Sequence, residues 1–232
     1  MNIQQFRYGS DNLAYVLFRG MEAAAVDPGA VNAISSFIQN RGLALKYVVN
    51  THTHPDHTTG NQAILNLTGA VYLDIDQLIR QREFALDGET VEVIHTPGHT
   101  KDSVVFHSDG ILVTGDTLFT GKAGKCFTGD YKAQFESIKK LMMFPENTTI
   151  HAGHDYVKEY MNTAKKIEPD NKAIDEFLKT YSPDNVFSTL ADEYRINPSL
   201  RFNSRKIIDV LKKQGLSVQT EYDRFRSVMS IV

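Results

Sequence analysis

The sequence predicts an α/β protein with sheets flanked by helices, followed by a small helical region. Up to about residue 155, short runs of β-branched and aromatic residues alternate with amphipathic helical patterns. Beyond that point the strand patterns stop, and helical patterns punctuated by Pro169, Pro183 and Pro198 take over. Many strands with interspersed helices favour sheets covered by helices over an all-β sandwich.

The expected elements can be placed in chain order. Strand patterns cover residues 15–18, 23–26, 46–50, 71–74, 91–95, 103–107, 111–114 and 149–151. Helical patterns cover residues 31–40, 60–67 and 132–143, and later residues 157–167, 171–180, 188–194 and 204–213. We therefore expect a β-rich domain over residues 1–165 and a helical domain over residues 166–232.

The composition excludes several classes of protein. The 232 residues include 25 basic and 28 acidic side chains, for a formal net charge of −3, so neither nucleic acid nor an anionic membrane is an expected partner. One cysteine cannot form an internal disulfide or a site built from several thiolates. The first residues lack the pattern of a signal peptide, and no segment reaches the roughly 18 apolar residues of a membrane span. We expect a soluble, cytoplasmic protein.

The third expected strand runs directly into four potential metal ligands in the pattern His-x-His-x-Asp-His. Residues two apart point the same way in extended backbone, so His52 and His54 can bind one ion. Pro55 ends the strand, and the turn after it can bring Asp56 and His57 to a second position close by. Nitrogen and carboxylate ligands of this kind suit zinc, iron or manganese.

Three further residues repeat one geometry, a polar side chain just past the end of an apolar strand. His99 follows a Pro-Gly turn, Asp116 follows Gly115, and His154 follows the strand expected at residues 149–151. Each alone is a weak signal, but loops at strand ends cluster at one edge of a sheet. We expect the three side chains to join the histidines of the first segment.

These seven residues, in this order, resemble the signature of the metallo-β-lactamase superfamily with both metal positions filled. The resemblance implies an αββα sandwich with the site at one edge. It assigns one metal to His52, His54 and His99, and the other to Asp56, His57 and His154, with Asp116 bridging the two. Asp56 and Asp116 are then the catalytic residues, acting with a bridging metal-bound hydroxide, because two close divalent ions lower the pKa of a shared water.

Later segments resemble the glyoxalase II family, the hydroxyacylglutathione hydrolases. They are Gly-Asp-Thr-Leu-Phe at 115–119, Gly-Lys-Ala-Gly-Lys at 121–125, His-Asp-Tyr at 154–156, Glu-Pro-Asp-Asn at 168–171 and Asn-Pro-Ser-Leu-Arg at 197–201. The resemblance spans nearly the whole chain and includes a small C-terminal α-helical domain, which most members of the superfamily lack.

The family resemblance implies a reaction and a substrate. The reaction is hydrolysis of S-(R)-lactoylglutathione to D-lactate and glutathione, a step of methylglyoxal detoxification, with two divalent ions per chain. Independently of the resemblance, we expect a monomer. The implied contacts to this small anionic thioester are made by Lys125, Phe127, Tyr156, Arg201 and Arg205. Lysine and arginine suit the substrate because both donate hydrogen bonds to carboxylates.

The chain departs from the family pattern at several positions. Cys126 and Phe127 stand where two aromatic residues are common, Lys122 and Ala123 replace Gly-Cys, and Asp155 replaces glutamate. Three alternatives therefore stay open: a glutathione persulfide dioxygenase with mononuclear iron, a lactonase or other thioesterase of the superfamily, and a binding module without catalysis. Retention of all seven ligands favours the binuclear hydrolase over the dioxygenase and the binding module.

Overall fold

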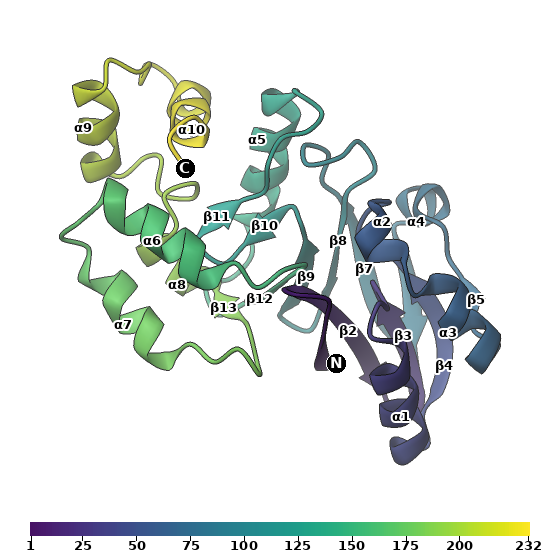
Figure 1. The fold of residues 1–232 in the computed structure, drawn as a ribbon. Coiled ribbons are helices and arrows are strands. Elements are labelled where there is room, and N and C mark those ends of the chain that lie inside the picture. The colour runs from purple at the N-terminus through teal and green to yellow at the C-terminus, as the bar shows by residue number, and fades with distance from the viewer.

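The buried side chains of β2 (Asn12–Arg19) alternate between two cores, and this alternation shows how the molecule is layered. Leu13, Tyr15 and Leu17 belong to a core shared with the second sheet, whereas Ala14 and Val16 belong to a core shared with helices. Successive side chains of a strand point to opposite faces, so each face of this sheet is covered by a different layer. The computed structural model, which describes residues 1–232, is a four-layered αββα sandwich (Figure 1).

Two sheets form the middle layers. The first has the strand order β1-β2-β3-β4-β5 and the second the order β13-β12-β9-β8-β7-β6, while β10 and β11 form a separate hairpin. The remaining strands are β1 (Asn2–Tyr8), β3 (Glu22–Val26), β4 (Ala44–Val49), β5 (Val71–Tyr72), β6 (Glu83–Leu86), β7 (Glu89–His95), β8 (Val104–Ser108), β9 (Ile111–Gly115), β10 (Leu118–Phe119), β11 (Lys122–Ala123), β12 (Thr149–Ala152) and β13 (Ser188–Thr189). Strand β3 pairs in parallel with β4, and β9 pairs in parallel with β12, so the carboxyl ends of each pair point in the same direction.

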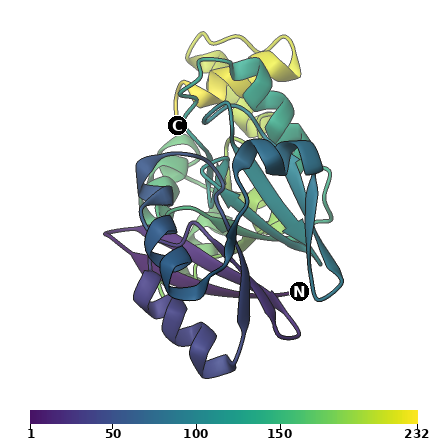
Figure 2. The same ribbon diagram turned by 90° about the vertical axis from the view of Figure 1, so that its right-hand side faces the viewer.

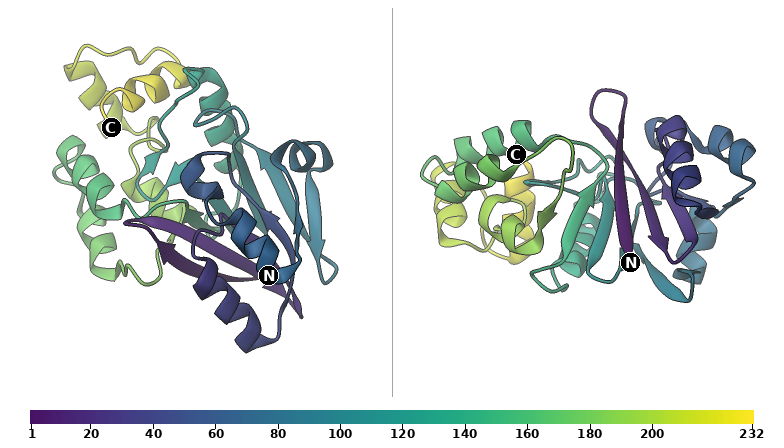
Figure 3. Two further views of the ribbon diagram at one scale, coloured as in Figure 1. Left: turned by 45° about the vertical axis from the view of Figure 1, so that its right-hand side comes forward. Right: turned by 90° about the horizontal axis from the view of Figure 1, so that it is seen from below.

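Helices form the outer layers. They are α1 (Val31–Arg41), α2 (Pro55–Thr58), α3 (Asn61–Thr68), α4 (Ile75–Gln81), α5 (Tyr131–Leu141), α6 (Val157–Ile167), α7 (Lys172–Thr180), α8 (Leu190–Ile196), α9 (Arg205–Lys213) and α10 (Glu221–Met229). The first sheet packs against α1 and α3, and the second against α5. The right panel of Figure 3 shows the early and the late helices on opposite sides of the strands, and in Figure 2 the early helices face the viewer with the late helices behind and above. None of these helices is long and apolar enough to cross a bilayer.

The C-terminal helices share their cores with the sheets. Val157, Met161 and Ala164 of α6 pack into the core between the sheets, and Leu190 of α8 packs into the core under α5. The division expected between residues 165 and 166 falls inside α6, which runs without interruption across it. A boundary between domains would therefore have to lie before Val157 or after Ile167.

Several expected elements change in the structure. The helix expected at 188–194 begins as β13, which extends the second sheet beside β12, and helix α8 starts only at Leu190. Thr189 and Asp192 form a capping box there, which fixes the start of the helix. Strand β1 was not expected, because its mostly polar sequence alternates only weakly and lies at the edge of its sheet. The charged helix α10 was not expected either.

Candidate metal centre

The candidate site lies where loops from both sheets meet at one edge of the sandwich. The loop after β4 carries the His-x-His-x-Asp-His segment, and the loops after β7, β9 and β12 carry His99, Asp116 and His154. These side chains are far apart in the sequence but form two groups of converging donor atoms. The expectation that the three strand-end residues join the first segment agrees with this geometry.

Local backbone geometry separates the ligands of the first segment. His54 is the N-cap of α2, and Pro55 occupies the first turn, where its missing N–H removes no hydrogen bond. The turn expected after Pro55 is therefore one turn of helix. It places Asp56 and His57 in a second group of donor atoms, distinct from the group of His52 and His54.

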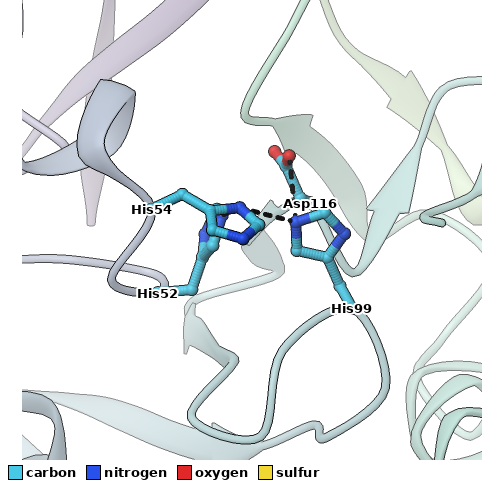
Figure 4. A group of neighbouring side chains, drawn as sticks. All are labelled: His52, His54, His99 and Asp116. Atoms are coloured by element: carbon cyan, nitrogen blue, oxygen red, sulfur yellow. Dashed lines mark hydrogen bonds and ion pairs between the residues drawn. The ribbon is translucent and has the colours of Figure 1, made fainter. Parts of the chain in front are cut away.

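The first group consists of His52, His54, His99 and Asp116 (Figure 4). His54 Nδ1 lies 2.9 Å from His52 Nε2 and 3.1 Å from His99 Nε2, and Asp116 Oδ2 lies 3.4 Å from His99 Nε2. Nitrogen ligands of a tetrahedral zinc ion, each about 2.0–2.1 Å from the metal, are about 3.3 Å apart. The separations in this group therefore fit a single ion.

The second group consists of Asp56, His57 and His154. His57 Nε2 lies 3.2 Å from His154 Nε2, and Asp56 Oδ2 lies 3.5 Å and 3.3 Å from these two nitrogens. Both histidines are buried, whereas the Asp56 side chain is 46% exposed. This group therefore offers two fixed nitrogens and one carboxylate that solvent can reach.

Asp116 lies between the two groups. Its Oδ1 is 3.4 Å from His57 Nε2, and its Oδ2 is 3.6 Å from His154 Nε2 in addition to its approach to His99. Oδ1 is buried without a hydrogen-bond partner, an arrangement that costs free energy unless a cation or donor satisfies it. A side chain on Gly153 would collide with this oxygen, since a Cβ there would lie 2.4 Å from Asp116 Oδ1.

Hydrogen bonds on the far side of the rings aim the free nitrogens at the centre. His57 Nδ1 lies 2.9 Å from Asp27 Oδ2, His154 Nδ1 lies 2.7 Å from Asp11 Oδ1, and His99 Nδ1 lies 3.0 Å from the Lys125 carbonyl oxygen. These oxygens only accept, so each Nδ1 donates its hydrogen, which leaves Nε2 as the atom that can bind a metal. Such outer partners are typical of histidines that bind metals.

The electrostatics also favour cations. Asp11, Asp27, Asp56 and Asp116 all face histidines, and none of them forms an ion pair with lysine or arginine. Burial lowers the pKa of His57, but the charges of Asp27 and Asp116 outweigh burial and raise this pKa to about 11. A metal ion at this position would therefore replace a proton.

The pKa of His52, the neighbouring ring, is shifted in the opposite direction. Desolvation, together with repulsion from His57, lowers the pKa of His52 to about 4, so His52 is neutral near pH 7. A neutral imidazole is the form that binds metals.

Of the expected substrate contacts, three lie beside the cluster. The ring of Phe127 lies 5.2 Å from that of His99 and 5.6 Å from that of His54, and Lys125 Nζ sits 4.7 Å from the Phe127 ring centre. Tyr156 stacks on His154 with ring centres 4.9 Å apart. Phe127 and Lys125 therefore lie beside the first group, and Tyr156 lies beside the second.

The two arginines have other neighbours. The Arg201 guanidinium forms an ion pair with the buried carboxylate of Glu168, and its side chain is only 14% exposed. Arg205 is exposed and pairs with Asp209 on its own helix, α9. No hydrogen bond or ion pair joins either arginine to the histidine cluster.

Four residues around the cluster were not expected from the sequence. They are Tyr8, Asp11 and Asn12 at the turn between β1 and β2, and Asp27 at the end of β3. Asp27 carries the same signal as Asp116, a carboxylate directly after an apolar strand, and this signal could have identified it. The residues of the turn follow a strand that the sequence did not predict, so no local pattern indicated them.

Comparisons with known proteins agree with the fold. A family model described as the metallo-beta-lactamase superfamily matches residues 7–73 and 72–154. The hydroxyacylglutathione hydrolase of Anaeromyxobacter dehalogenans is 33% identical over 217 residues, covering 85% of this chain and 85% of that protein. The hydroxyacylglutathione hydrolase of Psychromonas ingrahamii is 29% identical over 230 residues, covering 91% of this chain and 90% of that protein.

Solved structures share the fold. ETHE1 from Myxococcus xanthus aligns with a TM-score of 0.69 at 21% identity, covering 99% of this chain and 90% of that one. The BLEG-1 B3 metallo-beta-lactamase aligns with a TM-score of 0.66 at 21% identity, covering 86% of this chain and 99% of that one. At these identities the likeness concerns the fold alone.

Proposed function

The chain belongs to the hydroxyacylglutathione hydrolases of the metallo-beta-lactamase superfamily, and from this premise we propose that it is a binuclear thioester hydrolase acting on S-(R)-lactoylglutathione. The products would be D-lactate and glutathione. The observation that carries the proposal is the pair of ligand groups on either side of one shared carboxylate, Asp116. A site for a single ion would need only one of these groups.

In this proposal His52, His54 and His99 would hold one divalent ion, Asp56, His57 and His154 would hold the other, and Asp116 would serve both. The ions, when bound, would supply an ionised water near neutral pH and electrostatic stabilisation of the negative charge that develops on the thioester oxygen. Zinc, iron and manganese all suit this donor set.

The residues of the chain position the reactants. Asp56 is the exposed carboxylate of the cluster, and it would accept a hydrogen bond from the attacking water and orient it. A thiolate is a good leaving group, so its departure needs no dedicated acid. Phe127 and Tyr156 would flank the substrate beside the two ligand groups, and Lys125 would bind a carboxylate of the thiol carrier.

Arg201 and Arg205 remain proposed contacts to the carrier. Because Arg201 also neutralises Glu168, the test must separate binding from stability. A binding role predicts that Arg201→Lys raises the Michaelis constant for the glutathione thioester but not for a thioester of a small neutral thiol. An equal change for both substrates would contradict the assignment.

The proposal is tested by assaying the purified, metal-loaded enzyme with S-D-lactoylglutathione. Turnover supports it, and the absence of turnover at full metal loading would overturn the substrate assignment. The same preparation, assayed with glutathione persulfide and with lactones, tests the two rival reactions. One iron per chain together with oxygen consumption would indicate that the enzyme is a dioxygenase rather than a hydrolase. Gel filtration tests the expected monomer, and fractionation of the source cells tests the expected cytoplasmic location.

A further inference from the structure

The turn between β1 and β2, residues 8–12, touches the second ligand group and makes no hydrogen bond to the first group. Asp11 Oδ1 accepts a hydrogen bond from His154 Nδ1 at 2.7 Å. Asn12 Nδ2 donates to Asp56 Oδ2 at 2.9 Å, and Tyr8 Oη donates to the Asp56 backbone carbonyl at 2.9 Å. Three side chains of this turn therefore hold two of the three residues in the second group.

Backbone contacts fix the turn against the loop that carries His154. Leu13 N–H donates to the Gly153 carbonyl at 2.8 Å, and Asp155 N–H donates to the Asp11 carbonyl at 2.8 Å. Asn12 also forms an antiparallel bridge with His154. These bonds enclose His154 on both sides, so the position of its ring depends on the turn.

The first group has a different kind of support. His99 is oriented by the backbone carbonyl of Lys125, and His52 Nδ1 lies 3.1 Å from the hydroxyl of Thr51. Both partners are uncharged, whereas both histidines of the second group face a carboxylate, Asp27 or Asp11. A carboxylate behind a histidine makes the ring a stronger ligand than a neutral acceptor does, and loss of such a partner typically weakens metal binding about 10–100-fold.

We propose that the β1–β2 turn sets the affinity of the second metal position, and with it whether the chain holds one ion or two. This inference rests on the proposed binuclear function. Asp11 acts as a positioning residue through His154, and Asn12 acts through Asp56. A change confined to the turn would therefore yield a protein that keeps its first ion and loses its second.

The experiment is a titration of the metal-free protein with zinc in competition with a chromophoric chelator, which yields two dissociation constants. Asp11→Asn removes the charge but keeps an acceptor for His154, and Asn12→Ala removes the donor to Asp56. We expect each change to weaken the second constant about 10–100-fold and to leave the first within about twofold. Cobalt substitution adds a spectroscopic readout. When two equivalents of cobalt per chain are added to the turn variants, the absorption of the ion in the second position should be lost.

Asp109→Asn is the matched control. Asp109 also lies in a hairpin turn, between β8 and β9, and its carboxylate pairs with the N-terminal amine rather than with a ligand. This variant should bind both ions as the wild type does. Tyr8→Phe removes only the hydroxyl that donates to the Asp56 carbonyl. It replaces Asn12→Ala as the variant that acts through Asp56 if Asn12→Ala fails to fold.

Each outcome supports or contradicts the inference. Two ions in the wild type and unchanged constants in the turn variants would overturn the role of the turn and leave the proposed hydrolase intact. Equal weakening of both constants would indicate a general structural defect and would also overturn it. A wild type that binds only one ion would overturn the binuclear function itself, and with it this inference.

Discussion

Buried carboxylates occur in two regions of the molecule, and their surroundings differ. At the sheet edge, burial alone would raise the pKa of Asp116, but the neighbouring charge of His57 outweighs burial and lowers this pKa. In the helical region, burial raises the pKa of Glu193 to about 7, even though Ser188, Asn197 and the Gly121 N–H donate hydrogen bonds to it. All three partners of Glu193 are neutral.

The difference distinguishes carboxylates that can take part in metal binding from carboxylates that stabilise the fold. The carboxylates at the sheet edge face imidazoles and lack lysine or arginine partners, so a metal cation can complete their environment. Glu193 joins α8 to the loop between β10 and β11, and Glu168 joins α6 to Arg201. Changes to the carboxylates at the edge should therefore affect metal binding and rate, whereas changes to Glu193 and Glu168 should affect stability.

The largest effect is expected for Asp116→Asn. Loss of the charge that lies between the two ligand groups should lower kcat/KM by about 1000-fold or more, equivalent to about 4 kcal/mol of transition-state stabilisation. Metal analysis after dialysis should find fewer than two ions per chain. Asp184→Asn, at an exposed loop position, is the control. Full metal content in Asp116→Asn would contradict the assigned position between the ions.

A smaller effect, in stability rather than metal content, is expected for Arg201→Met. The change leaves the Glu168 carboxylate buried without its cation, and breaking a buried pair costs about 3–5 kcal/mol. Urea denaturation of the metal-loaded protein measures this loss. The double variant Arg201→Met/Glu168→Gln should recover most of it, and a double variant as unstable as the single one would argue against the pair.

The raised pKa of Glu193 predicts the direction in which the stability of the protein changes with pH. Below the ordinary value of 4.5 this carboxyl is protonated in both folded and unfolded chains. Between that pH and about 7 only the unfolded chain loses the proton, so the stability of the wild type falls as the pH rises, by on the order of 3 kcal/mol in total.

Glu193→Gln keeps the shape and cannot ionise, so the comparison with wild type isolates this one group. The variant should gain stability relative to wild type as the pH rises from 5 to 8, as measured by urea denaturation at each pH. A difference that does not change with pH would contradict the buried, raised-pKa carboxyl. Metal content should be the same in both proteins.

The smallest effect is expected at the start of α8. Thr189→Ala removes the capping box and should cost about 1 kcal/mol of stability, with kcat unchanged. Thr220→Ala removes the equivalent capping box of α10 and provides a matched comparison. A loss of activity in Thr189→Ala with no loss of stability would mean that the helical region contributes to the chemistry.

The sequence predicted most of the site because its signals are local. His52, His54, Asp56 and His57 stand within six residues, and the other ligands each follow an apolar strand, so periodicity and turn residues were sufficient. The layered arrangement followed from the alternation of strands and helices and from the family resemblance.

Long-range partners could not be predicted in this way. Arg201 pairs with a glutamate 33 positions earlier, and Asp11 reaches a histidine 143 positions later. Nothing near either residue in the sequence signals its partner, because these pairs exist only once the chain has folded. Strand β13 was missed for the same reason, since its pairing with β12 overrides a helical pattern.

The central claim is that two ligand groups sharing Asp116 form a binuclear thioester hydrolase. It is tested most directly by titrating the metal-free enzyme with zinc while following the hydrolysis of S-D-lactoylglutathione. We expect the rate to reach its maximum at two ions per chain. Full activity at a single ion per chain, or no hydrolysis at full metal loading, would contradict the claim.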